Sequence, residues 1–317
     1  MQEKIISKAI KFLEDGQVVG IPTETVYGLA ADAYNASAVN KVFSIKKRPL
    51  TSPMIVHTCN ITRVMPLITH MPSDAMHLAK HFWPGPLTLL LDKSALIPHI
   101  VNAGLPKVGI RVPKHPLTQE LLERLPFPLV APSANPFGYI SPTKVEHVRA
   151  QLGSEVPYVL DGGTCKRGLE STIVGFEKGK TIIYRLGSVT QEEIEAVIGS
   201  PVISLPYSEK EAHLTPGRTK KHYSPHTPII VGDLPILAEK YKAFDVVVLC
   251  FDTHLDKITH KKQIILSPKG SLEEAAQRLF EVLHILDSRG ADLIIAPVFP
   301  QEGLGRVINE RLLRASS

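Results

Sequence analysis

Helix-like and strand-like hydrophobic patterns alternate along most of this chain, and this alternation constrains the fold more than any other feature. Ile6, Ile10 and Leu13 recur at helical spacing, Gly16 follows as a helix stop, and residues 18–21 form a short apolar run typical of a buried strand. The same order returns several times before residue 200, and we expect Thr143 to cap one of the later helices and Thr190 with Glu193 to form a capping box for another. Short turns join some predicted strands and helices join others, so we expect residues 1–200 to form an α/β domain with a twisted mixed sheet.

The alternation stops at residues 201–228 and then resumes. This stretch collects Pro, Ser and charged residues without apolar periodicity, which is typical of a linker. Beyond it, strand patterns such as 246–251 and 293–298 alternate with helix patterns, and Ser271 caps the longest of these. The order predicts a smaller, largely parallel, Rossmann-like α/β domain over residues 229–317.

The composition permits several kinds of partner and excludes few. The 317 residues are 44% hydrophobic, enough for about two domains with buried cores. Lys and Arg number 36 against 31 Asp and Glu, and the net charge of +5 permits anionic partners without requiring them. Three widely spaced cysteines argue against a disulfide framework, and no apolar run approaches the length of about 18 residues that a membrane helix needs. We expect a soluble, cytoplasmic protein without membrane contact.

Four segments carry polar residues that folding alone does not require. The first, residues 22–29, places Thr25 after a buried strand, where open α/β sheets bind ligands, although on this segment alone a capped helix start is the simpler interpretation. In the second, Lys46, Arg48 and Ser52 lie between prolines. They would suit a phosphate, or the cations would only stabilise a helix C-terminus.

The third and fourth segments also leave two interpretations open. Ser133, Asn135 and Ser141 offer neutral hydrogen bonds near a helix start, or belong to an ordinary Asn-Pro turn before a capped helix. The fourth comprises residues on predicted strands: Lys107, Arg111, Ser171 and Arg185. Cations that point inward would need an anion, whereas cations on an exposed sheet face would extend into solvent.

Common signatures of metal and nucleotide sites are absent from the sequence. His77 and His81 have the spacing of a zinc-binding helix, but Leu78 stands where the catalytic Glu would be, so we expect no protein-held metal. Gly303 and Gly305 lack the third glycine of the dinucleotide fingerprint. There is no Walker loop and no nucleophile elbow.

Taken together, short motifs in a fixed order resemble the YrdC-like family, and the two-domain layout resembles its long form, the two-domain threonylcarbamoyl-AMP synthases. The matching stretches are residues 22–29 (PTETVYGL), 46–49 (KKRP), 53–57 (PMIVH), 83–88 (WPGPLT), 110–113 (IRVP), 131–135 (APSAN), 141–143 (SPT) and 170–174 (ESTIV). Residues 216–225 and 303–315 resemble the linker and the C-terminal ending of the long form. Each motif is short, but their ordered occurrence is specific.

The resemblance implies a nucleotidyltransferase that makes L-threonylcarbamoyladenylate and pyrophosphate from L-threonine, bicarbonate or CO2, and ATP, for threonylcarbamoyladenosine modification of tRNA. Mg²⁺ would be held mainly by phosphates. The residues implied for catalysis are Lys46, Arg48, Ser133 and Asn135. Those implied for L-threonine are Thr25, His57, Arg111, Ala131 and Ser171. Those implied for ATP are Arg48, Ser52, Lys107, Ser133, Ser141, Arg185 and Tyr223, the last from a linker that would close as a lid.

Other functions remain open at this point. An RNA-binding module could use the same basic residues without nucleotidyl transfer, although aromatic residues are only 6% of the chain and no RNA-binding signature occurs. A carbamoyl-transfer domain of a hydrogenase-maturation protein has a similar fold, but it normally accompanies zinc-finger and acylphosphatase regions that this chain lacks. Partner proteins in tRNA modification and weak RNA binding are both compatible with the sequence.

Overall fold

The computed structural model describes residues 2–205, 222–256 and 258–316. By its contacts the chain divides into two units. The described part of the first comprises residues 2–137, 142–166 and 170–205, and that of the second comprises 138–141, 167–169, 222–256 and 258–316. Most of the predicted linker, residues 206–221, lies outside the described residues. Its closing as a lid therefore stays a prediction.

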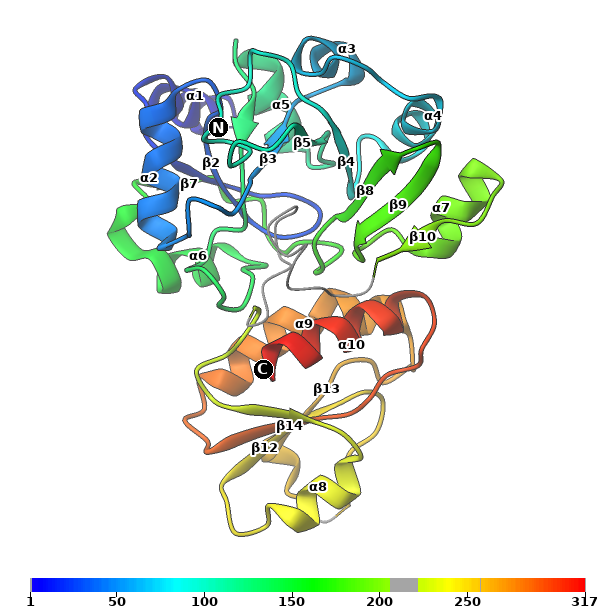
Figure 1. Cartoon of the computed structure of the whole chain (residues 1–317). Coiled ribbons are helices and arrows are strands. Elements are labelled where there is room, and N and C mark those ends of the chain that lie inside the picture. The colour runs from blue at the N-terminus through cyan, green and yellow to red at the C-terminus, as the bar shows by residue number, and fades with distance from the viewer. Residues whose placement is uncertain (1, 206–221, 257, 317) are drawn as a thin grey trace. The chain divides into compact units, whose positions relative to one another are not determined.

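A ten-stranded sheet with the order β10-β9-β8-β4-β5-β3-β6-β2-β1-β7 organises the first unit (Figure 1). Its strands are β1 (Val19–Ile21), β2 (Gly28–Asp32), β3 (Ile55–His57), β4 (Leu87–Asp92), β5 (Lys107–Arg111), β6 (Leu129–Val130), β7 (Tyr158–Val159), β8 (Thr172–Glu177), β9 (Lys180–Arg185) and β10 (Ile203–Ser204). Four neighbouring pairs are parallel, β1 with β7, β3 with β5, β4 with β8 and β9 with β10, and the other five are antiparallel. The predicted mixed sheet is confirmed.

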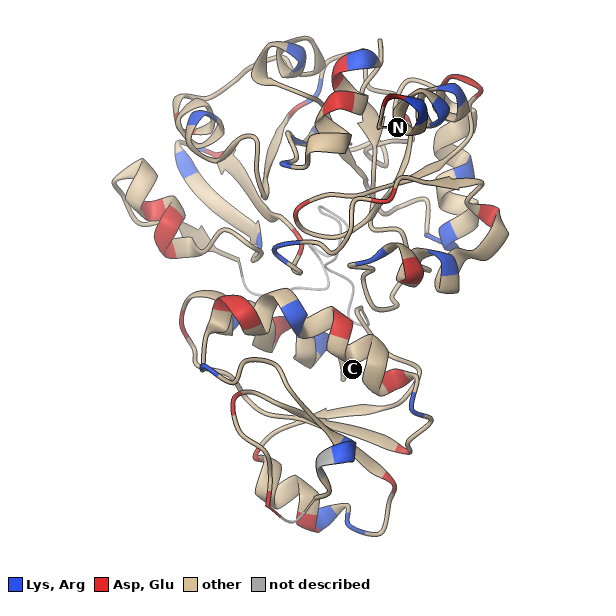
Figure 2. Ribbon diagram, turned by 180° about the vertical axis from the view of Figure 1, so that it is seen from behind, with Lys and Arg blue, Asp and Glu red and all other residues tan. Residues whose placement is uncertain are grey.

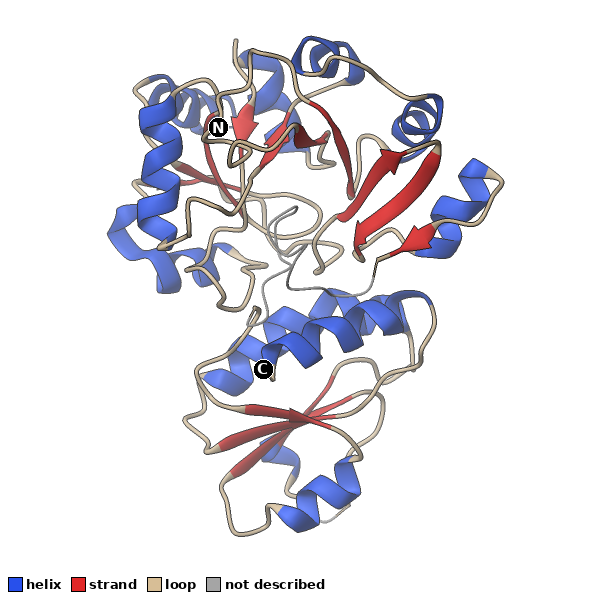
Figure 3. Ribbon diagram, in the orientation of Figure 1, coloured by secondary structure: helices blue, strands red, loops and turns tan. Residues whose placement is uncertain are grey.

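Helices cover both faces of this sheet (Figure 3). Successive residues of β2 point to opposite faces, so Leu29 and Ala31 join one apolar cluster and Ala30 the other. The cluster of Ala30 includes residues of α1 (Gln2–Glu14) and α5 (Pro116–Arg124). The other includes residues of α2 (Ala36–Lys46), α3 (Ile61–Val64), α4 (Ser73–Phe82), α6 (Val145–Leu152) and α7 (Gln191–Ile198). Short 3-10 turns lie at η1 (Met65–Leu67) and η2 (Gly153–Glu155).

The second unit contains a four-stranded parallel sheet, as predicted, with the order β11-β14-β12-β13. Its strands are β11 (Ile229–Val231), β12 (Val246–Cys250), β13 (Gln263–Ile265) and β14 (Leu293–Ala296), and its helices are α8 (Leu234–Lys240), α9 (Leu272–Asp287) and α10 (Gly303–Ala315), with a 3-10 turn η4 (His260–Lys262). Val246, Val248 and Cys250 pack in one cluster with Leu237 of α8. Ser271 accepts the main-chain N–H of Glu274 and so caps α9, as expected.

The structure corrects the sequence interpretation at three places. Residues 22–27 are a loop that leads into β2 and not a helix start, because the small residues of β2 hid its strand character. Thr143 does not cap α6, whose N-cap is Lys144. β10 lies inside the predicted linker and pairs with β9. By contrast, the predicted capping box of Thr190 and Glu193 is present at the start of α7.

Candidate active site

Arg111 is the best-defined cation of the candidate site. It ends β5, is 4% exposed, and pairs in register with His57 at the end of the parallel strand β3. Its Nε donates to the carbonyl of Gly85 at 3.3 Å, and its Nη2 donates to Thr25 Oγ1 at 2.9 Å. The same Nη2 forms an ion pair with Glu24 at 2.9 Å. Its Nη1 has no partner among the described residues, so one nitrogen remains for an anionic ligand.

The hydroxyls of Thr23 and Thr25 form a chain with a fixed direction. Thr23 Oγ1 lies 2.6 Å from the carbonyl of Val26, which can only accept, so the Thr23 hydroxyl donates there. In the 2.8 Å contact between the two hydroxyls, Thr25 must therefore be the donor. Since Thr25 gives its only proton to Thr23 and accepts from Arg111, it could meet a ligand only as an acceptor. Its main contact in the structure is with Arg111.

His57 is a neutral acceptor in this site. Its Nδ1 lies 3.1 Å from the carbonyl of Ile55, and because a carbonyl only accepts, Nδ1 carries the proton. Burial, and then the charge of Arg111, lower the pKa of His57 to about 3. Nε2 is therefore unprotonated, and it has no partner among the described residues. A ligand at this position must offer an N–H or O–H.

Lys46 holds the loop that follows β6. Its Nζ donates to the carbonyls of Ser133 and Asn135, both at 2.5 Å, and the N–H of Phe137 donates back to the carbonyl of Lys46 at 2.7 Å. Burial and the charge of Arg48 lower the pKa of Lys46 well below its ordinary value, whereas the two carbonyls favour the ammonium form. Because this side chain serves main-chain groups, we expect Lys46 to shape the site more than to react in it.

Two further arginines influence each other. Arg48 is 8% exposed, and its Nε and Nη2 donate to the carbonyls of Ser52 and Pro53 at 3.2 and 2.8 Å. Burial, and then the charge of Arg185, lower the pKa of Arg48 to about 10, so two guanidinium groups share one region. Arg48 pairs with no carboxylate among the described residues. Two neighbouring buried cations are costly unless an anion neutralises them, which makes this region suitable for phosphate.

Ser171 connects Arg185 to the centre of the sheet. Arg185 Nη2 donates to the carbonyl and hydroxyl of Ser171 at 2.6 and 3.1 Å, and the Ser171 hydroxyl lies 2.7 Å from that of Thr88. Ala131 lies at the end of β6, and its N–H donates to the carbonyl of Ile55 at 3.2 Å. In the strand order, β8, which follows Ser171, and β6, which precedes Ala131, each stand two places from β5, with β4 and β3 between them.

Not every predicted residue joins this group. Lys107 begins β5, which Arg111 ends, so the two lie roughly 13 Å apart along the strand. Lys107 Nζ donates to the carbonyl of Phe176 and pairs with Glu177 at 3.3 Å near the β8–β9 turn. The sequence left two alternatives for the cations on these strands. Lys107 fits the one in which the cation extends toward solvent, and Arg111 fits the one in which it points inward. A contact of Lys107 with ATP stays a prediction.

Two predicted ATP residues belong to the second unit by their contacts. The Ser141 carbonyl lies 3.1 Å from Nε2 of His284. Tyr223 is 1% exposed, stacks on Phe280 with ring centroids 5.5 Å apart, and lies beneath the guanidinium of Arg311 at 4.9 Å. Both assignments to ATP remain predictions.

Glu24 and Thr88 were not among the predicted site residues. The segment 22–29 suggested either a carboxylate near a ligand or a residue in the first turn of a helix for Glu24, whereas the structure pairs Glu24 with Arg111. Thr88 contacts Ser171, whose partner on a neighbouring strand only the sheet order reveals. The available signal for Glu24 was a charged residue three positions after the end of a fully apolar strand, where a buried cation would be its natural partner.

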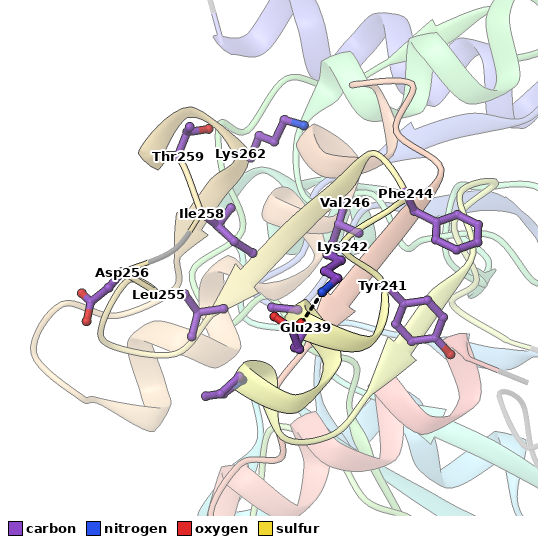
Figure 4. A pocket seen from close by; sticks show the side chains of 12 residues that line it. Glu239, Tyr241, Lys242, Phe244, Val246, Leu255, Asp256, Ile258, Thr259 and Lys262 are labelled. Carbon is purple, nitrogen blue, oxygen red and sulfur yellow. Dashed lines mark hydrogen bonds and ion pairs between the residues drawn. The ribbon is translucent and has the colours of Figure 1, made fainter.

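The second unit has a cavity of about 540 Å³ between α8 and the segment before β13 (Figure 4). Apolar side chains such as Val246, Leu255 and Ile258 line it, and Lys242 pairs with Glu239 at its rim. It lies at the amino end of β12, whereas nucleotide sites of parallel α/β sheets lie at the carboxyl ends. This cavity is therefore not a Rossmann-type nucleotide site.

Among the residues that the structure describes, no group of three or more His, Cys, Asp or Glu side chains could hold a metal ion. In the same residues, no helix is long and apolar enough to cross a bilayer. Glu24 and Glu170 are the buried carboxylates among the described residues, and Glu24 pairs with Arg111.

Comparison with known proteins agrees with this architecture. Residues 11–187 match the Sua5–YciO–YrdC family model, described as telomere recombination, and residues 189–317 match the model of the threonylcarbamoyl-AMP synthase C-terminal domain. Threonylcarbamoyl-AMP synthases from Pyrococcus abyssi and Bacillus subtilis are 34% and 37% identical to the chain, covering 100% and 98% of it and 95% and 92% of their own lengths. The crystal structure of P. abyssi Sua5 complexed with L-threonine superposes with a TM-score of 0.93 at 34% identity, covering 100% of the chain and 95% of its own. The chain therefore belongs to the Sua5–YciO–YrdC family and carries the C-terminal domain of threonylcarbamoyl-AMP synthases.

Proposed function

We propose that this protein is a threonylcarbamoyl-AMP synthase, which forms L-threonylcarbamoyladenylate and pyrophosphate from L-threonine, bicarbonate or CO2, and ATP. The names of the full-length relatives support this function. The observation that carries it is the pairing of Arg111, which has one open nitrogen, with His57, which has one open acceptor, at the adjacent ends of two strands. Both features match an amino acid with a hydroxyl group.

In the proposed threonine complex, the substrate carboxylate accepts from Arg111 Nη1 and the substrate hydroxyl donates to His57 Nε2. An arginine is suited to a carboxylate because both are planar and oppositely charged. Serine would keep both contacts but lose a methyl group, and a pocket rejects a missing methyl by only about 1–3 kcal/mol. Alanine would leave His57 without its donor, so we expect it to be rejected more strongly.

The reaction then needs little acid–base chemistry from the protein. The neutral substrate amine attacks the carbon of CO2: the N–C bond forms while one C–O π bond opens onto oxygen, and the proton that the amine loses passes to bicarbonate or water. An oxygen of the resulting carbamate attacks the α-phosphorus of ATP, and the bond from that phosphorus to the leaving pyrophosphate breaks. Arg48 and Arg185 lie together where they would neutralise the phosphate charge. Lys46 would hold Ser133 and Asn135 in place for the nucleotide.

When bound, Mg²⁺ would neutralise part of the negative charge on the phosphates of ATP. The residues that would meet the phosphates are the cations and hydroxyls Arg48, Ser52, Ser133 and Arg185, so the ion itself would be held by phosphate oxygens and water. This fits Arg48, whose guanidinium pairs with no carboxylate in the part of the chain that the structure describes.

The product would supply the group that modifies tRNA, with later steps carried out by partner proteins in the cytoplasm. The second candidate, an RNA-binding module, would require a coherent basic surface. In Figure 2, Lys and Arg are interspersed with Asp and Glu on both units. This mixed distribution favours small anionic substrates over an extended RNA backbone.

The test is release of pyrophosphate from ATP by the purified chain without RNA. We expect release to depend on both L-threonine and bicarbonate. Arg111→Met should raise the KM for threonine and leave that for ATP nearly unchanged, whereas Arg48→Met should do the reverse. Pyrophosphate release that does not depend on threonine, or no pyrophosphate release by the wild-type protein, would refute the proposed function.

A further inference from the structure

Glu24 is a buried carboxylate with one oxygen in an ion pair and the other in a hydrogen bond. The side chain is 7% exposed and extends from the loop between β1 and β2. Oε1 pairs with Arg111 Nη2 at 2.9 Å, and Oε2 accepts the main-chain N–H of Lys114 at 3.0 Å. Burial of a charged group is unfavourable unless it is paired, and this pairing joins the loop to the end of β5 and the residues just beyond.

The pairing determines which part of Arg111 is available. Nε is held by the carbonyl of Gly85, and Nη2 is held by Glu24 and by the hydroxyl of Thr25. These three partners fix the plane of the guanidinium and leave Nη1 as its one nitrogen without a partner in the described residues. Glu24 also places a negative charge beside Arg111, so a ligand carboxylate meets a cation that is already partly neutralised.

Neither conservative replacement preserves both contacts of Glu24. Glutamine has one amide oxygen, so it can accept from Arg111 or from the N–H of Lys114 but not from both, and its NH2 group would face the other donor. Aspartate keeps two oxygens but is shorter by one methylene. The geometry thus requires a carboxylate at this distance from the main chain.

We propose that Glu24 is a positioning residue for the threonine step, which orients Arg111 so that Nη1 faces the substrate carboxylate. This inference rests on the proposed function, in which Arg111 binds L-threonine. A residue that only anchors its loop would change folding, or would affect ATP and threonine alike. A residue that acts through Arg111 should affect threonine alone, and only while Arg111 is present.

The first experiment measures steady-state KM values by pyrophosphate release in the full-length protein. We expect Glu24→Gln to raise the KM for threonine about tenfold and to leave that for ATP within about twofold. Glu120→Gln is the matched control, because Glu120 of α5 also pairs with an arginine, Arg124 at 3.6 Å, but its side chain is 35% exposed. It should change neither KM. Equal changes in both KM values for Glu24→Gln, or none, would overturn the proposal.

The second experiment is a double-mutant cycle with calorimetric titration of L-threonine. In an Arg111→Met background, Glu24→Gln should change the threonine affinity by less than about twofold, because the residue through which it acts is gone. Additive losses of affinity would overturn the proposal. If Glu24→Gln does not fold, as judged by the fluorescence of the single Trp83, Glu24→Asp takes its place in both experiments, with the same expectation.

A ligand-free measurement separates this proposal from the proposed function. Nitrogen-15 spectra should resolve distinct Nη signals for Arg111 in the wild-type protein, since its guanidinium is held, and Glu24→Gln should merge them. Wild-type protein that binds no threonine but shows these signals would refute the proposed function and the threonine role of Glu24, while the positioning of Arg111 would stand. Threonine binding with merged wild-type signals would overturn the positioning itself.

Discussion

The buried neutral imidazole of His57 makes the stability of the first unit depend on pH in a way that can be calculated. Burial and the charge of Arg111 lower the pKa of His57 from 6.5 to about 3 in the folded protein. Between these values the unfolded chain takes up a proton that the folded protein does not. Stability is therefore lost as the pH falls below about 6.5, and this loss ends near pH 3.

The expected magnitude follows from the linkage relation. Each pH unit below 6.5 costs about 1.4 kcal/mol, so His57 should account for about 2 kcal/mol of lost unfolding free energy by about pH 5. Carboxylates contribute their own pH dependence, so the useful quantity is the difference between wild type and His57→Gln. The variant should lose about 2 kcal/mol less than wild type between about pH 7 and pH 5.

Urea unfolding followed by fluorescence of Trp83 measures this difference, because the only tryptophan is buried in the first unit. His77→Gln is the control, since that ring is exposed and solvated before and after unfolding. It should keep the wild-type loss of stability. Equal losses for wild type and His57→Gln would refute the assignment of His57 as a buried neutral base.

Three further predictions concern Lys46 and Gly85 of the first unit and Ser271 of the second. Lys46→Met removes a donor from two main-chain carbonyls and should lower the unfolding free energy by about 2 kcal/mol in urea titrations; unchanged stability would contradict its role in holding the loop. Gly85→Ala would place its Cβ 2.1 Å from the carbonyl oxygen of Phe82, so we expect at least about 2 kcal/mol of destabilisation, together with a higher threonine KM because Gly85 also holds Arg111. Ser271→Ala removes the N-cap of α9 and should cost about 1 kcal/mol of stability, measured by thermal unfolding; an unchanged melting temperature would show that the cap contributes nothing.

Local patterns predicted most individual elements, because hydrophobic periodicity and capping are recorded in neighbouring residues. The capping box at Thr190 and the parallel strands of the second unit are examples. The strand β2 was missed because Gly28, Ala30 and Ala31 are too small to show a strand pattern, yet they are completely buried between two layers of helices. β10 was missed because a strand of two residues is too short to show the alternation of apolar and polar residues that marks a strand.

The candidate site was predictable in its residue types but not in its connections. Lys107 and Arg111 were grouped as cations of one predicted strand, and nothing in the sequence distinguished the buried end of β5 from the end that pairs with Glu177. The partnership of Glu24 with Arg111 joins residues 87 positions apart, and depends on the order of strands in the sheet. Such pairings follow from tertiary structure, which single-sequence patterns do not record.

The central claim is that this protein joins L-threonine, CO2 and the adenylyl group of ATP. The most direct measurement incubates the purified chain with L-threonine, ATP, Mg²⁺ and carbon-13 bicarbonate, and analyses the nucleotide products by mass spectrometry. We predict an adduct of threonine and AMP that carries one carbon-13 atom and disappears with Arg111→Met. Adenylate without the label, or labelled adduct in equal yield without Arg111, would contradict the account.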